Sequence, residues 1–312
     1  MHLYKPAKTL SAIILAITVI LGVSLPQTTH ADFVETCAAR DFDHGKLWEI
    51  RKDKGSKSYI FGTMHSKDSR ILHLPGVVMQ ALNRSNVFMM ETTLSQKAMS
   101  QIQAMMLAPA GENISAQLSP ERIDQLKPII AEYDMPIEVV TRFKIWATAS
   151  IISQPPSSRM QKGEQLKLLD RELEKLARGQ GKSVIALELA TDQLNIFDDL
   201  SKAAQLELLD SAIKDNAELD VEIEKLTQHY LRGETGWFFC NMEDDLKAAS
   251  PEIRDFVLNK LIINRNHHMA KGIAAQISNA SGFVAIGALH LPGKQGVLKL
   301  LENEGFSIRR RF

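Results

Sequence analysis

A motif that occurs twice constrains the fold of this 312-residue chain more than any other feature. In each copy an apolar run leads into Gly-x-x-His, and Leu-Pro-Gly follows. The first copy spans residues 59–76 and carries His65, and the second spans residues 283–293 and carries His290. Each pattern predicts a buried strand, a loop with the histidine, a helix that Leu-Pro-Gly begins, and a second strand. The chain therefore predicts an α/β fold: a central, mostly parallel sheet built from two similar strand-helix-strand halves.

Chemically active side chains follow several of the predicted strands. His65 and His290 come after two of the apolar runs, and Glu91 and Glu188 end two others. Functional groups of parallel α/β sheets gather beyond the carboxyl ends of the strands, so we expect these side chains to lie together. A carboxylate at the end of the apolar run 87–90 is unfavourable unless it is paired, which also favours a functional site.

These residues resemble the TraB/GumN family. The resemblance is carried by the paired Gly-x-x-His motifs with their Leu-Pro-Gly sequences, by Glu91, and by Arg265-Asn266 on a late predicted helix. It covers about Leu47 to Arg310. The family is related to the Tiki metalloproteases, which share the paired motif. The resemblance therefore implies hydrolysis of a peptide. It also places Arg265 or Asn266 at the site as a substrate-binding residue. The alternative is that Arg265 lies on the surface or only packs its helix.

Two imidazoles and one or two carboxylates suit a divalent metal such as Zn, Mn or Co. We choose His65, Glu91 and His290 as ligands, with Glu188 as a fourth ligand or a general base. A metal bound there would lower the pKa of its water and polarise a carbonyl group. The resemblance to the Tiki proteases implies a metal such as Mn or Co.

Two alternatives remain open for the same residues. A histidine oriented by a glutamate can take a proton from water without a metal, as is thought to happen in the more distantly related erythromycin esterases. The crevice can also bind a peptide without chemistry, as in pheromone shutdown by the TraB branch. Asp68 can serve either role by hydrogen bonding to substrate. The chain has no His-Glu-x-x-His and no Gly-x-Ser-x-Gly sequence, which argues against the common zinc-protease helix and a serine nucleophile.

The N-terminus predicts export. Lys5 and Lys8 precede an apolar run, and small residues near Ala31 suit a signal peptidase, so residues 1–31 are expected to be a signal peptide rather than a membrane anchor. The mature protein, residues 32–312, would be periplasmic or secreted, without a stable membrane span. An oxidising compartment permits a disulfide between the two cysteines, Cys37 and Cys240.

The rest of the mature chain predicts a single α/β domain with a large helical insertion at about residues 95–180. Residues 1–31 hold two lysines and no acid, so 35 of the 37 basic residues remain in the mature chain against 37 acidic ones. This balance gives no indication of nucleic acid as a partner, and a peptide or small-molecule substrate is expected. Nothing in the sequence predicts the oligomeric state.

Several further elements have clear sequence signals. Residues 46–52 and 59–61 flank a turn-rich stretch and predict an edge hairpin. Ser250-Pro251-Glu252 predicts the start of a long helix that reaches Ile277. Arg309-Arg310-Arg311 in the last predicted strand is typical of a solvated sheet edge.

Overall fold

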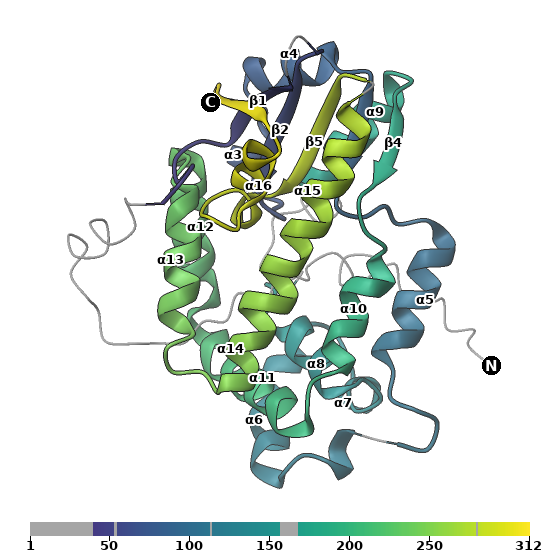
Figure 1. Cartoon of the computed structure of the whole chain (residues 1–312). Coiled ribbons are helices and arrows are strands. Elements are labelled where there is room, and N and C mark those ends of the chain that lie inside the picture. Colours follow the sequence, from purple (N-terminus) through teal and green to yellow (C-terminus); the bar gives the residue numbers. More distant parts are fainter. Residues whose placement is uncertain (1–39, 53–54, 113, 157–167, 279) are drawn as a thin grey trace.

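A six-stranded, mostly parallel sheet forms one end of the molecule in the part of the chain that is described here (Figure 1). The computed structural model describes residues 40–312, except 53–54, 113, 157–167 and 279. The strand order is β4-β3-β5-β2-β1-β6. The strands are β1 (Leu47–Lys52), β2 (Ser58–Thr63), β3 (Val87–Met90), β4 (Ser183–Ala186), β5 (Gly282–Gly287) and β6 (Phe306–Arg310). Strands β4, β3, β5 and β2 are parallel, as the repeated motif predicts.

Helices cover both faces of the sheet, because alternate residues of the strands are apolar on both sides. Phe61 and Phe283 belong to the cluster on one face, whereas their neighbours Ile60 and Val284 belong to the cluster on the other. The first face packs against α3 (Ser69–Leu72), α4 (Gly76–Arg84), α9 (Leu169–Gly179) and α12 (Leu219–Arg232). The second face packs against α15 (Asn264–Ile277) and α16 (Val297–Asn303).

The other end of the molecule is a helical layer with its own apolar core (Figure 1). It draws on two stretches of the chain, one between β3 and β4 and one between β4 and β5, whereas α9 packs on the sheet. Its core includes Ile102, Met106, Phe143 and Trp146, and the partly buried Met99 and Met105 pack against it. Its helices are α5 (Gln96–Met106), η1 (Ile114–Ala116), α6 (Pro120–Ala131), α7 (Ile137–Val140), α8 (Ile145–Ile152), α10 (Ala190–Asp198), α11 (Lys202–Asp215), α14 (Pro251–Asp255) and η5 (Phe256–Ile263). The short η4 (Asn216–Glu218) leads from α11 into α12, and α13 (Thr235–Asp245) packs against α12.

Strand β5 lies between β2 and β3, which brings the two motif copies side by side. Gly62 pairs with Ile286, and Thr63 pairs with Gly287. A Cβ on Gly62 would come within 2.6 Å of a Leu291 side-chain carbon, so a larger residue would clash with the second motif. Close approach of the other motif copy, rather than an unusual φ, therefore explains the glycine of the first motif.

The structure corrects two expectations about local elements. The hairpin of β1 and β2 is not at the edge, because β6 pairs with the outer side of β1 and itself forms the edge. Pro75 precedes the helix that begins at Gly76, as expected, but the second Leu-Pro-Gly forms a turn in which Gly293 has φ +89°, and α16 begins only at Val297. Each histidine therefore precedes only a short helical turn or lies within one.

The long helix predicted after Ser250 is present but is not uniform. Ser250 caps it by accepting a hydrogen bond from the amide of Ile253, and it continues through α14, η5 and α15 to Ile277. The segment η5 is π-helical. Among the described residues, no helix combines the length and the apolar character needed to cross a bilayer.

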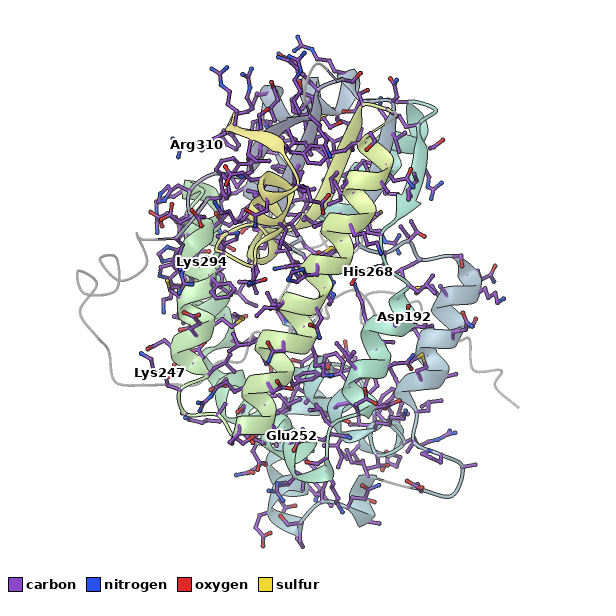
Figure 2. The ribbon with its side chains drawn as sticks, in the orientation of Figure 1. Asp192, Lys247, Glu252, His268, Lys294 and Arg310 are labelled. Atoms are coloured by element: carbon purple, nitrogen blue, oxygen red, sulfur yellow. The ribbon has the colours of Figure 1, made fainter. Side chains whose placement is uncertain are left out.

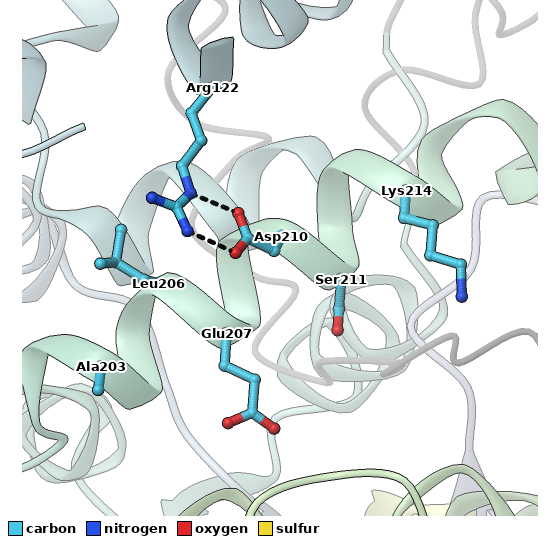
Figure 3. Close-up of a pocket in the computed structure, with 7 residues that line it drawn as sticks. All are labelled: Arg122, Ala203, Leu206, Glu207, Asp210, Ser211 and Lys214. Carbon is cyan, nitrogen blue, oxygen red and sulfur yellow. Dashed lines mark hydrogen bonds and ion pairs between the residues drawn. The ribbon is translucent and has the colours of Figure 1, made fainter. Parts of the chain in front are cut away.

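An open pocket of about 490 Å³ lies on the helical layer between α6 and α11 (Figure 3). Its charged Arg122 is already held by a two-point ion pair with Asp210, at 2.6 and 2.8 Å. None of its lining residues is a predicted site residue. The strand ends, which lie at the junction of the sheet and the helical layer, are therefore the better candidate for a functional site.

Candidate active site at the carboxyl edge of the sheet

His65 follows β2 and is held by a carboxylate from a distant part of the chain. Its Nδ1 lies 2.7 Å from Oδ2 of Asp170, which is 105 residues away in the sequence. The other carboxylate oxygen, Oδ1, accepts a hydrogen bond of 2.7 Å from the hydroxyl of Thr63. A carboxylate only accepts hydrogen bonds, so Nδ1 of His65 carries the proton and Nε2 is the ring nitrogen left for other partners.

His290 lies in the short turn η6 (Ala288–His290), directly after β5, and is held by an amide. Its Nδ1 is 2.6 Å from Oδ1 of Asn266. The amide nitrogen of Asn266 donates to the carbonyl of Gln295, which establishes that the oxygen faces the imidazole. Nδ1 of His290 therefore carries the proton as well, and Nε2 is again the remaining nitrogen.

Glu91 follows β3 and lies between the two motif copies. Its Oε1 accepts a hydrogen bond from the amide of Gly287 at 2.6 Å and lies 3.9 Å from Nε2 of His290. A Cβ on Gly287 would lie 3.2 Å from the same carboxylate oxygen. The glycine of the second motif thus lets the carboxylate approach the backbone closely.

Glu188 follows β4 and lies beside Glu91. The amide of Glu188 donates to the carbonyl of Glu91 at 2.8 Å, so the pairing of the two strands continues beyond their ends. Its carboxylate also accepts a hydrogen bond from the amide nitrogen of Gln193 on α10. The two predicted glutamates are therefore neighbours at the same edge of the sheet.

Arg265, the second residue of α15, joins the two glutamates. It donates to Glu188 from Nε at 3.0 Å and from Nη2 at 2.9 Å, and Nη2 also donates to Glu91 at 2.7 Å. The π-helical η5 directly precedes α15, and π-helical segments are frequent at functional sites. Both residues of the predicted Arg-Asn pair thus belong to the site, where each holds another side chain of the cluster.

The charges of the cluster shift several pKa values. Burial alone would lower the pKa of His65, but the charge and hydrogen bond of Asp170, together with the charge of Glu91, raise it to about 9. Burial and the charge of Arg265 lower the pKa of His290 to about 4. Burial disfavours the charged form of Glu91, yet Arg265 and the histidines outweigh this effect and hold its pKa well below the usual range. The two motif histidines thus differ in charge at neutral pH.

Other sequence candidates have roles outside this cluster. Asp68 is the N-cap of α3, where its carboxylate accepts from the amide and the guanidinium of Arg70. His267 and His268 are exposed, and Nε2 of His268 lies 3.1 Å from the carbonyl oxygen of Leu187 (Figure 2). Cys240 is buried on α13 and accepts a hydrogen bond from Arg40. Cys37 and the signal peptide lie outside the described residues, so their roles stay predictions.

Asp170 was missed by the sequence reasoning. It lies in the first turn of α9, on the same buried face as Leu169 and Leu173. An acidic residue on the apolar stripe of a helix is the signal that could have found it, because a buried carboxylate requires a partner. The sequence alone does not show that this partner is His65.

The cluster provides imidazole nitrogens and carboxylate oxygens but is not a preformed cage. Within the described ranges, no group of three or more His, Cys, Asp or Glu side chains is arranged to hold a metal ion. The chemistry of the donors nevertheless fits a cation. Glu91 and Glu188 share one arginine, Arg265, whereas the carboxylate of Asp170 pairs with His65. The charges of Asp170 and Glu91 keep a proton on His65.

A parallel sheet with paired histidines and glutamates beyond its strand ends defines an α/β protein with a polar site at the carboxyl edge. The chain belongs to the TraB/PrgY/gumN family, whose model matches residues 46–310. It is similar to Metalloprotease TIKI2 of Danio rerio, with 23% identity over 84% of this chain and 60% of the relative. It is also similar to Metalloprotease TIKI homolog of Amphimedon queenslandica, with 23% identity over 96% of this chain and 67% of the relative. No solved structure matches the chain.

Proposed function

We propose that this protein is a metal-dependent hydrolase, of the metallopeptidase type, that cleaves a peptide outside the cytoplasm. The names of its relatives support the class, although the chain spans only 60% of the length of the Danio rerio protein. One observation of the site carries the proposal. Both motif histidines have Nδ1 bound to a side-chain oxygen, Asp170 for one and Asn266 for the other, which leaves Nε2 on each ring. Metal-binding histidines are oriented in this way.

The residues that would hold the metal are His65, His290 and Glu91. His290 suits this role because the neutral form of imidazole is the ligand and its pKa is lowered to about 4. Glu91 provides the negative charge that a divalent ion requires. A bound Zn, Mn or Co would lower the pKa of a water molecule and polarise the carbonyl group of the substrate.

The remaining residues orient these groups. Arg265 holds the carboxylates of Glu91 and Glu188 in place at the ends of two strands. Glu188 remains a fourth ligand or the general base, because Gln193 and Arg265 position its carboxylate at the same edge. Asn266 fixes the ring of His290.

The site also gives specific support to a second candidate, a hydrolase without a metal. His65 and Asp170 form an imidazole-carboxylate pair at 2.7 Å, which is the arrangement of a histidine that acts as a general base. Because the pKa of His65 is raised to about 9, it would gain base activity only as the pH approaches that value. Metal-free activity that increases up to about pH 9 would therefore identify this mechanism.

Metal analysis combined with a peptide assay tests the proposal. The purified protein would be stripped with a chelator, reloaded separately with Zn, Mn and Co, and incubated with a pool of random 14-residue peptides, with cleavage followed by mass spectrometry. We expect cleavage that the chelator abolishes and metal restores. His65→Ala and His290→Ala should abolish it, whereas His73→Ala, an exposed histidine with the same change, should not.

The other outcomes assign the other functions. Cleavage that persists after complete removal of metal contradicts metal dependence and supports the His65–Asp170 base. Retention of peptides without any cleavage indicates a binding protein. His290 is only 3% exposed, so its alanine variant also loses packing, and thermal melts must accompany both assays.

A further inference from the structure

Asp170 is a buried acid that neither copy of the repeated motif contains. We propose that Asp170 is a positioning residue: it holds His65 as the Nδ1-protonated form with Nε2 facing the site, and so sets the affinity of the site for a divalent metal. The metal part of this inference rests on the proposed function. The orientation of His65 does not depend on it.

The contacts of Asp170 point to His65 rather than to the packing of its own helix. Asp170 is 4% exposed, and its two oxygens are bound by Thr63 and His65, each at 2.7 Å. Both partners belong to the end of β2, on the other side of the interface between α9 and the sheet. Among the described residues, no Lys or Arg lies within ion-pair distance of Asp170, so His65 is its charged partner. A buried carboxylate without such a partner would cost several kcal/mol.

A second acid on the same helix shows what a purely structural role looks like. Glu174 lies one turn after Asp170 on the buried face of α9. Its carboxylate bonds to Arg171 at 2.7 Å and to Arg178 at 2.8 Å, both on the same helix. Glu174 thus stabilises α9 itself, whereas Asp170 reaches the motif histidine. The two residues make a matched pair for mutation.

The surroundings of Asp170 restrict it to one orientation. The hydroxyl of Thr63 occupies one carboxylate oxygen. Burial and the charge of Asp170 raise the pKa of Tyr230, whose hydroxyl donates to the carbonyl of Gly62 at 2.8 Å. The second oxygen of Asp170 is therefore directed at Nδ1 of His65.

The partner of His290 is an amide, so the two motif histidines are held differently. An amide oxygen orients the ring of His290 without adding a charge. The carboxylate of Asp170 orients His65 and also increases the electron density of its ring, which strengthens Nε2 as a ligand. Loss of Asp170 should therefore weaken metal binding through both orientation and charge.

Three variants separate these effects. Asp170→Ala removes the partner, Asp170→Asn keeps an oxygen that can still accept from Nδ1 but removes the charge, and Glu174→Gln is the control. Zn²⁺ affinity would be measured by titration calorimetry on the full mature chain. The nitrogen that carries the proton in the neutral ring of His65 would be identified from the ¹⁵N signals of the ring in the metal-free protein above pH 9, where the second proton has left. Melting temperatures would accompany both measurements.

We expect Asp170→Ala to weaken Zn²⁺ binding by about 100-fold and to give mixed ring forms of His65. Asp170→Asn should keep the Nδ1-protonated form and lose about 10-fold in affinity, and Glu174→Gln should change neither quantity. If Asp170→Ala does not fold, Asp170→Asn still tests the charge. Unchanged affinity and ring signals in the folded Asp170 variants would overturn the inference. A wild-type protein that binds no Zn²⁺, Mn²⁺ or Co²⁺ would refute the proposed metal dependence and the metal part of the inference, while the ring signals would still decide the orientation.

Discussion

Nε2 of His290 lies 3.9 Å from Oε1 of Glu91, although the two residues belong to different strand-helix-strand halves of the chain. The amide of Gly287 binds the same oxygen at 2.6 Å. The second motif thus holds Glu91 at the point where strands β3 and β5 end, so the cluster combines residues of both halves.

Glu91→Gln should separate a ligand from a base. If Glu91 is a ligand, the loss of its charge weakens metal affinity, and added metal restores part of the activity. If it acts in general-base chemistry, metal content is unchanged and kcat falls by about 100-fold at every metal concentration. We expect the first result. Glu188→Gln is the comparison, because it removes the other carboxylate bound to Arg265 and tests the fourth-ligand or general-base role of Glu188 in the same assays. Wild-type activity with unchanged metal would leave Glu91 with a structural role.

Arg265→Gln should strongly destabilise the protein. The side chain of Arg265 is 12% exposed and joins Glu91 and Glu188, so its loss removes the counter-charge that these two carboxylates share. We expect the free energy of unfolding at pH 7 to fall by about 3–5 kcal/mol in urea titrations. The double variant Arg265→Gln/Glu188→Gln should recover part of this loss. Additive effects of the two changes would contradict the coupling.

In the metal-free protein, the two motif histidines together should stabilise the fold most near pH 6.5. The folded state raises the pKa of His65 from 6.5 to about 9, so its contribution is complete below about pH 6.5 and is lost as the pH rises through 9. The folded state lowers the pKa of His290 to about 4, so the unfolded chain binds the extra proton and stability falls as the pH drops from 6.5 to 4. Each of these two changes, the alkaline arm from His65 and the acidic arm from His290, alters the free energy of unfolding by up to about 3 kcal/mol.

Urea titrations in chelator between pH 4 and 9.5 would measure both arms. His65→Gln should flatten the alkaline arm and leave the acidic arm in place. His73→Gln, at an exposed position, should change neither. An alkaline arm that persists in His65→Gln would show that another group causes it.

Asp68→Ala tests whether this residue binds substrate or only caps a helix. Its carboxylate accepts from the amide of Arg70 at 2.8 Å and pairs with the Arg70 side chain, which also contacts Glu224. We expect a loss of about 1 kcal/mol in stability and an unchanged KM for any peptide substrate. Ser119→Ala removes the cap of α6 and should behave in the same way. An increase in KM for the Asp68 variant alone would return it to the substrate site.

The predicted processing of the chain can be checked by mass. We expect the exported protein to begin near Asp32 and to carry a Cys37–Cys240 disulfide, since export and the pair of cysteines predict both. Intact mass and thiol labelling without reductant would show them. A mass that corresponds to residues 1–312, or two reactive thiols, would contradict this prediction.

The sequence by itself determined the parallel α/β class and brought His65, His290, Glu91 and Glu188 to one edge. It could do so because apolar runs identify buried strands and the carboxyl ends of parallel strands share one side of a sheet. The placement of β5 between β2 and β3, and of β1 inside the sheet, depends on long-range pairing that local patterns do not record.

Only the tertiary structure decided the partners of the site residues. Arg265 and Asn266 matched a motif, but the motif does not show which side chains they hold. Their roles depend on how their side chains are directed from α15, the helix that follows the π-helical η5. Asp170 is 105 residues from His65 and comes from a helix whose pattern shows only a buried acid. The ends of the strands follow from local sequence periodicity. Which side chains pair with one another depends on how the helices pack on the sheet. Buried charges find their partners only when this packing is complete.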